Sequence, residues 1–155
     1  MTTPLNSPLE VGIRVFMLLA EAIPETLDVN RLVLLDHAVL HSEDLGGPTS
    51  LHPPLPIRAG EFGMRRAVLT QGLDVMVQAG LVEAVVTVNG IEFRATDRAP
   101  AFTRVLASSY ARRLQDRSRW AISTFGDIDE DSLRLSMREI FAAWSEEFDD
   151  SQGAT

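Results

Sequence analysis

Residues 60–96 read GEFGMRRAVLTQGLDVMVQAGLVEAVVTVNGIEFRAT, and this stretch decides the fold. Its first part has apolar residues at the three-to-four spacing of a helix, which we expect over about 61–79. Gly80 follows that helix directly. Because glycine adopts the left-handed conformation without steric cost, we predict that Gly80 is the C-cap that ends the helix.

Two short runs of alternating apolar and polar residues come next, joined by Asn89-Gly90. Alternation with period two is typical of a half-buried strand, and Asn-Gly favours a two-residue type I′ turn. We therefore predict a β-hairpin over about 82–96 with its apolar residues on one face. The predicted register pairs Val88 with Ile91, Thr87 with Glu92 and Val86 with Phe93.

Helical spacing dominates the rest of the chain. Ser7-Pro8-Leu9-Glu10 is a capping box that begins a helix, and Asp28 and Ser108 precede further helices. A helix followed by a hairpin is typical of a winged helix. We therefore predict a mainly α protein with one β-hairpin, in which residues 1–126 form a winged-helix-like domain with additional C-terminal helices. Residues 127–148 are expected to form an amphipathic helix packed on this domain or on a partner, and residues 149–155 a frayed tail.

Glycine and proline are dense over residues 43–60, EDLGGPTSLHPPLPIRAG, so no regular structure is expected there. A segment this long is either a rigid loop folded over the core or a loop that contacts a partner. His37 and His41 share a helix face and His52 lies in this loop. Without the adjacent glutamate of a metalloprotease this pattern is weak, and we predict no metal site.

Composition limits the class of protein. At 155 residues and 45% hydrophobic, the chain can bury one core, so one domain is expected. It has no Cys, which excludes disulfides and thiolate chemistry. It also lacks an apolar run long enough for a membrane span and a recognisable signal peptide, so we expect a cytoplasmic protein without membrane contact.

Charge is unevenly distributed along the chain, whose net charge is −8. Residues 1–57 contain 2 Arg and 7 acidic residues, residues 58–119 contain 10 Arg and 6, and residues 120–155 contain 2 Arg and 9. The basic third coincides with the helix and hairpin. The acidic total argues against a free-standing nucleic-acid binder, for which a basic domain is expected.

Catalytic motifs are absent from the sequence. Gly46-Gly47-Pro48 lacks the Lys and the Ser or Thr of a P-loop, and neither GxGxxG nor GxSxG occurs. We therefore expect no enzyme activity, no cofactor and no small-molecule substrate.

Arg14 and Asp36 each interrupt a helix that is otherwise nearly all apolar. Because a buried charge is costly unless paired, we predict that these two, or one of them with Glu10 or Arg31, form an ion pair that fixes the register of the two helices.

Two sets of side chains are candidates for contacts with other molecules. The candidates for DNA or partner contact are basic and lie around the helix and hairpin, although Asp74 and Glu92 beside them would repel phosphate. They are Arg58, Arg65, Arg66 and Arg94. The candidates for partner docking form an apolar stripe on the C-terminal helix. They are Leu133, Met137, Trp144 and Phe148.

Several motifs together resemble a known family. They are NSPLEVGIR at 6–14, LVLLD at 32–36, HSEDLGGP at 41–48, SLHP at 50–53, the arginines of 58–66 and AGLV at 79–82. Over about residues 6–125 the chain looks like the middle component of bacterial ABC-three-component systems. The resemblance implies a small winged-helix-type, non-enzymatic subunit encoded beside an SMC-like or ABC-type ATPase and an effector. Such systems, Lamassu-type assemblies among them, are associated with defence against phages and plasmids.

Two functions follow as expectations. The first is an adaptor that bridges the ATPase and the effector from the same operon and meets DNA only through the complex. The second is a winged-helix DNA-binding transcription regulator that forms a homodimer through its terminal helix. The acidic net charge favours the adaptor.

Overall fold

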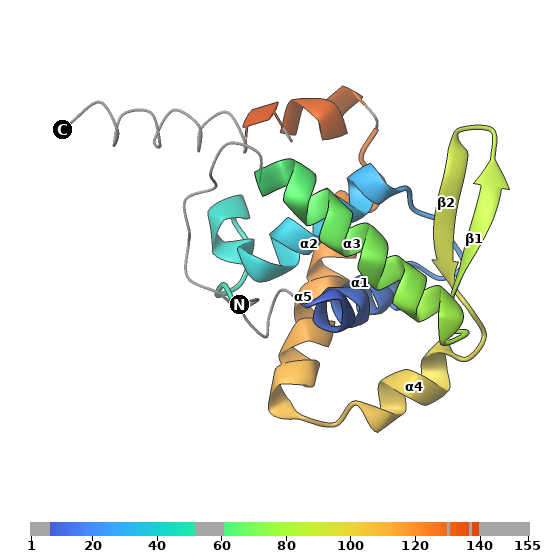
Figure 1. Cartoon of the computed structure of the whole chain (residues 1–155). Helices are drawn as coiled ribbons and strands as arrows, with labels where there is room; N and C mark the ends of the chain where they lie inside the picture. Colours follow the sequence, from blue (N-terminus) through green and yellow to red (C-terminus); the bar gives the residue numbers. More distant parts are fainter. Residues whose placement is uncertain (1–6, 52–60, 130, 137, 140–155) are drawn as a thin grey trace.

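The computed structural model describes residues 7–51, 61–129, 131–136 and 138–139, with only the backbone given for Asp44 and for residues 61–63. Helices form most of the molecule, and one hairpin lies at its edge (Figure 1), which confirms the prediction of a mainly α protein with one hairpin. Residues 131–136 and 138–139 are also helical. The elements are α1 (Pro8–Ala22), α2 (Val29–Leu40), the 3-10 helix η2 (Ser42–Leu45), α3 (Glu61–Gln78), β1 (Val82–Thr87), β2 (Gly90–Ala95), α4 (Ala99–Val105) and α5 (Ser109–Phe125).

Local capping chemistry explains where several helices begin and end. The predicted N-caps Ser7, Asp28 and Ser108 accept hydrogen bonds from backbone N–H groups three residues later, at 3.3, 2.8 and 3.1 Å. After α3, Gly80 has a φ of 76°, as the predicted left-handed C-cap requires. Gly126 is the C-cap of α5.

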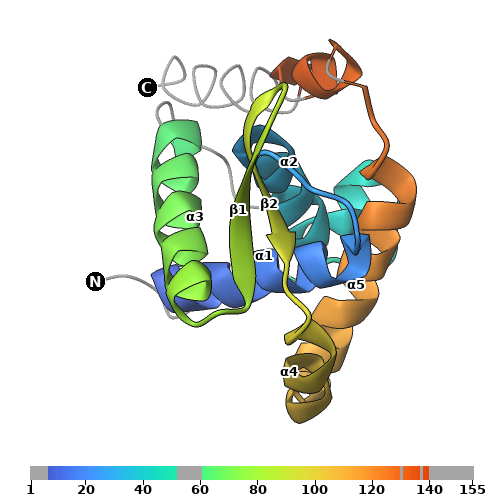
Figure 2. The same ribbon diagram turned by 90° about the vertical axis from the view of Figure 1, so that its right-hand side faces the viewer.

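Helix α1 lies at the centre of the fold, crossed by α3 and covered from the other side by α5 (Figure 2). The crossing with α3 is made at Gly12 and Gly72. A Cβ atom added to Gly72 would lie 2.7 Å from the Gly12 nitrogen, closer than side-chain carbons pack. These two glycines therefore allow the helix backbones to touch. The largest fully buried side chains around this crossing include Phe16, Leu18, Leu19, Leu32, Leu35, Leu69 and Leu73.

The hairpin register differs from the prediction by two residues. Val86 pairs with Ile91, and Thr87 pairs with Gly90, so the turn residues are Val88-Asn89. A type I′ turn needs positive φ at both central residues, but among the described residues only Gly46, Gly80 and Gly90 have it. Gly90, with φ of 109°, follows the turn instead of lying within it. A shift of two preserves the alternation, so the predicted apolar face is retained.

Leu27, between α1 and α2, forms an isolated bridge with Phe93 of β2, with N–H···O distances of 2.8 Å in both directions. Leu27 therefore lies beside β2, while β1 lies at the outer edge of the hairpin. The element order of helix, single bridging residue, two helices and hairpin is the order of a winged helix. The winged-helix assignment itself stays a prediction.

The glycine- and proline-rich segment begins with ordered structure. Contrary to the expectation of no regular structure, η2 occupies its first residues. The Ser42 hydroxyl donates to the Pro48 carbonyl at 2.6 Å, and the Ser50 hydroxyl accepts from the Glu43 N–H at 3.0 Å. These side-chain hydrogen bonds stabilise a segment in which glycine and proline disfavour regular backbone hydrogen bonding. Residues 52–60, including His52 and Arg58, lie outside the described residues.

Helix α5 holds this segment in place. Arg117 Nε donates to the Thr49 carbonyl at 2.9 Å. Gly47 lies against the Trp120 indole so closely that an added Cβ atom would be 2.3 Å from Trp120 Cζ2. Residues 42–51 are therefore a loop folded against the helical body, as one of the two sequence interpretations proposes.

The C-terminal region begins with an acidic cap. Asp129 Oδ1 accepts from the Ser132 N–H at 2.8 Å, and Arg31 donates to the Ile128 carbonyl. Of the helix predicted over 127–148, residues 131–136 and 138–139 are helical. Residues 130, 137 and 140–148 and the predicted tail at 149–155 lie outside the described residues. Among the described residues, no helix combines the length and the apolar character needed to cross a bilayer.

Candidate interaction surfaces

A buried ion pair connects α1 and α2. Arg14 Nε lies 2.8 Å from Asp36 Oδ1, and Arg14 Nη2 lies 3.1 Å from Asp36 Oδ2. Of the partners considered from sequence, the structure thus brings Arg14 and Asp36 together. The two residues are 3% and 7% exposed, so water screens this fork-to-carboxylate contact weakly.

Both members of the pair are charged. Burial alone would raise the pKa of the Asp36 carboxyl, but the charge and hydrogen bonds of Arg14 outweigh burial and hold that pKa below its ordinary value. Burial likewise opposes the charged form of Arg14, and the attraction of Asp36 overcomes it, so the pKa of Arg14 is raised. Each charge is therefore stabilised mainly by the other.

Two histidines lie next to this pair. His37 and His41 are buried, and their ring centroids are 4.9 Å apart. Burial first, and then the neighbouring His41 and Arg65, lower the pKa of His37 to about 3. His37 is therefore neutral at physiological pH. Within the part of the chain that the structure describes, no group of three or more His, Cys, Asp or Glu side chains is arranged to hold a metal ion.

The arginines predicted to touch DNA or a partner mostly contact this chain. Arg94 Nε lies 2.5 Å from Glu83 Oε1 on the neighbouring strand. Arg66 donates to the Asn30 side chain at the start of α2. Arg65 is half-buried, and its charge acts on Asp36 and His37. The fourth predicted residue, Arg58, lies outside the described residues.

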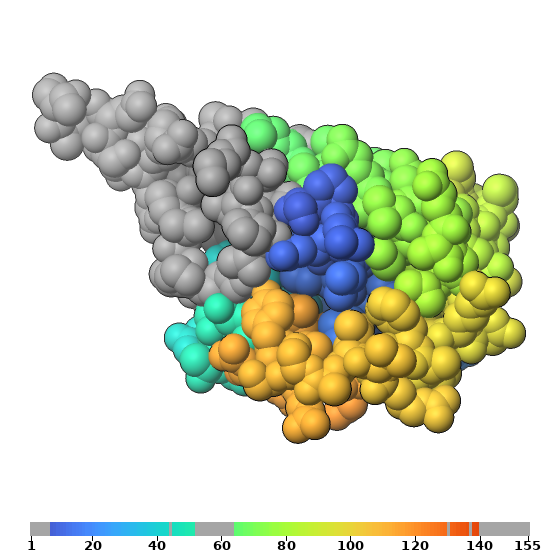
Figure 3. Space-filling view, turned by 60° about the horizontal axis from the view of Figure 1, so that its bottom comes forward, coloured from blue at the N-terminus to red at the C-terminus, as the bar shows by residue number. Residues whose placement is uncertain are grey.

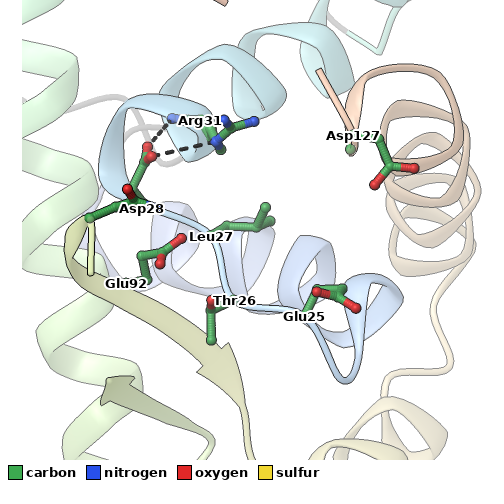
Figure 4. Close-up of a pocket in the computed structure, with 9 residues that line it drawn as sticks. Glu25, Thr26, Leu27, Asp28, Arg31, Glu92 and Asp127 are labelled. Carbon is green, nitrogen blue, oxygen red and sulfur yellow. Dashed lines mark hydrogen bonds and ion pairs between the residues drawn. The ribbon is translucent and has the colours of Figure 1, made fainter. Parts of the chain in front are cut away.

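An acidic pocket lies beside the hairpin (Figure 4). It has a volume of about 190 Å³. Asp28 and Glu92 lie close together on one side of it, and Glu25 and Asp127 lie on the opposite side. Arg31 is its one basic lining residue, and Arg31 contacts Asp28 at 3.4 Å. Such a pocket repels phosphate next to the very hairpin that a winged-helix DNA reader would use.

An apolar groove lies where α1 meets α4 and α5. Figure 3 shows this side of the molecule, with α1 in blue and α4 and α5 in yellow and orange. The groove has a volume of about 360 Å³, and its polar lining residues are Glu10, Arg14, Ser108 and Tyr110. Its apolar lining comes from α1, α5 and the connection between α4 and α5. These residues are Ile13, Met17, Leu106, Ala111 and Leu114.

The far end of the hairpin carries exposed apolar side chains. Val86, Val88 and Ile91 are 84%, 101% and 61% exposed, whereas Val82 and Ala95 at the base are buried. The predicted apolar face is thus real, but the helical body covers only its lower part. The alternating pattern that identified the strands does not indicate how far along them the helical body extends.

A model of the family described as the ABC-three component (ABC-3C) system Middle Component 2 matches residues 4–147. The chain belongs to this family. No curated protein and no solved structure matches the chain. This middle component is therefore one part of a three-part ABC system, which the sequence resemblance predicted.

The docking residues predicted on the C-terminal helix of this middle component are only partly described. Leu133 is 2% exposed, so its side chain is buried and not available on the surface. The neighbouring Leu135 is 55% exposed. Met137, Trp144 and Phe148 lie outside the described residues.

Sequence reasoning missed the apolar groove of the middle component. The spacing of apolar residues along each helix cannot reveal that α5 and the connection before it leave an opening over α1. The break at Leu106, between two helices that both face α1, is the local signal that could have indicated it.

Proposed function

We propose that this middle component is a non-catalytic, cytoplasmic adaptor that bridges an SMC/ABC-type ATPase and an effector in a bacterial anti-phage or anti-plasmid complex. Family membership supplies the three-part system. The observation that carries the adaptor role is the apolar groove between α1, α5 and the connection that precedes α5.

The groove fits the apolar side chains of a partner protein. Ile13 and Leu106 are half-buried, and the adjoining Val105 is 77% exposed, so apolar surface continues from the groove onto α4. Burying apolar surface contributes about 25 cal/mol per Å² removed from water, which makes such a groove a favourable site for apolar anchors. Tyr110, which also lines the groove, supplies a polar group that can orient a partner.

The charges support contact with DNA only through the assembled complex. Arg94 and Arg66 bond within the chain, and the acidic pocket lies beside the hairpin. A winged-helix regulator acting as a homodimer, the alternative function, would need free basic side chains at this position.

Co-purification tests the proposal. The three components are co-expressed from their operon, and the middle component is captured by a tag. Ala111→Gln places a polar side chain in the groove, and Ala107→Gln makes the same change at an exposed position outside its lining. We expect Ala111→Gln, but not Ala107→Gln, to reduce recovery of the ATPase or the effector.

Two results would contradict the adaptor. One is a wild-type chain that co-purifies with neither component. The other is tight, strongly salt-dependent DNA binding by the isolated chain, measured by fluorescence anisotropy at two salt concentrations, which would support the regulator instead.

A further inference from the structure

The outer edge of β1 is an unpaired strand edge. β1 pairs with β2 on one side, and β2 in turn meets Leu27 on its far side. Within the described residues no strand lies on the other side of β1, and the backbone hydrogen bonds of residues 83–87 go only to β2. In Figure 1 this strand is the outermost element on the right of the molecule.

This edge has none of the features that usually prevent strands from pairing. Proteins protect such edges with Pro, Lys, bulges or inward-pointing charges. The sequence of β1, VEAVVT, contains neither Pro nor Lys, and its pairing with β2 is continuous from Val82 to Thr87. Its only charge, Glu83, is paired with Arg94. The edge is therefore free to accept an extended strand.

The occupant can be argued from the sequence of the strand itself. Outward-pointing backbone groups recur at every second residue, so two identical antiparallel strands can pair only when each residue faces one of the same parity. Every register centred on a single residue meets this condition, and the one centred on Val85 pairs all of residues 83–87. It places Val85 opposite Val85 of the second copy, Ala84 opposite Val86, and Glu83 opposite Thr87.

We propose that two copies of this chain pair through the outer edges of β1 as antiparallel strands in this register. No like charges face each other, because Glu83 lies opposite an uncharged hydroxyl. Two-fold pairing in the plane of the sheet also places the exposed Val86 side chains of both copies on the same face, where they become neighbours. The β1 edge is thus compatible with a second copy of itself in hydrogen bonds and apolar surface, without like charges facing each other.

The dimer is expected to be weak. One strand edge buries much less than the roughly 1,600 Å² of a standard interface. Each copy also carries a net charge of −8, so the copies repel each other over the Debye length, about 30 Å at 0.01 M and 8 Å at 0.15 M salt. Added salt screens this repulsion and should shift the equilibrium toward dimer, opposite to the behaviour of an interface held by ion pairs.

A disulfide tests the register. The chain contains no Cys, so Val85→Cys introduces a single thiol, and directly opposite residues in an antiparallel pair have Cα atoms about 4.5–5.5 Å apart, within disulfide range. Under mild oxidation we expect Val85→Cys to form a covalent dimer at least about tenfold faster than Val105→Cys, a matched change at an exposed valine on α4. Val86→Cys, which faces Ala84 in this register, should be intermediate.

Sedimentation velocity on the wild-type chain, over a range of concentration and salt, accompanies the cross-linking. A shift toward dimer as the protein concentration and the salt concentration increase supports the proposal. A monomer under all conditions, or cross-linking of Val85→Cys no faster than that of Val105→Cys, overturns it. Because both measurements use the purified chain alone, their failure leaves the adaptor proposal and its co-purification test unaffected.

Discussion

Breaking the Arg14–Asp36 pair from one side should destabilise the protein strongly. Asp36→Leu leaves a guanidinium that is 3% exposed without its carboxylate, and Arg14→Met leaves a carboxylate on a residue that is 7% exposed. Removing one partner of a buried pair costs about 3–5 kcal/mol, a large part of the roughly 5–15 kcal/mol that holds a domain folded. At about 2–4 °C per kcal/mol for a chain of this size, the melting temperature should fall by about 6–20 °C.

The double variant Arg14→Met/Asp36→Leu distinguishes a paired charge from ordinary packing. With both charges removed, no desolvated ion remains, and apolar replacements of similar volume are often neutral or stabilising. We expect urea unfolding monitored by circular dichroism to show the double variant within about 1–2 kcal/mol of wild type. If its loss equals the sum of the two single losses, the pair has no coupling energy and the reasoning fails.

Three further predictions concern packing and protonation. Gly72→Ala should destabilise the fold by about 1–3 kcal/mol, because its Cβ atom would meet the α1 backbone at 2.7 Å; a gain in urea stability would contradict this. Gly47→Ala should displace the Trp120 indole and shift the fluorescence maximum of a Trp144→Phe background; an unchanged spectrum would show that the loop does not contact α5. Folding lowers the pKa of His37 from 6.5 to about 3, so between these pH values the unfolded chain binds more protons than the folded chain. The free energy of unfolding should therefore decrease as the pH is lowered through this range, by up to about 1.4 kcal/mol per pH unit. His37→Gln should remove one proton from that dependence, and an unchanged pH profile would count against a buried neutral His37.

Features set by a few adjacent residues could be predicted from the sequence. Ser7, Asp28 and Ser108 cap helices because a short polar side chain and a nearby backbone N–H suffice. The hairpin was predictable as an element but not in register, since Asn-Gly is compatible with more than one turn and the φ of Asn89 decides between them. The Arg14–Asp36 ion pair was predictable because each buried charge required a partner, although the sequence also left Glu10 and Arg31 as candidates.

Contacts between distant segments left no such signal. In the sequence, α3, the hairpin, α4 and most of α5 lie between Gly47 and Trp120. Neither residue type indicates that it contacts the other. The apolar groove depends on how far α4 and α5 lie from α1, which the spacing within each helix does not encode. Exposure of the hairpin end depends likewise on where the helical body stops.

The basic central third illustrates why a count of charges does not identify a DNA surface. Arg94 pairs with Glu83, Arg119 lies 3.5 Å from Glu21, and Arg117 bonds to both Asp116 and a loop carbonyl. An arginine that already neutralises a carboxylate releases few counterions on meeting phosphate, so it adds little to binding. What distinguishes a binding surface from a structural one is therefore the number of arginines left without an internal acid, and the acidic pocket lowers the potential around the hairpin further.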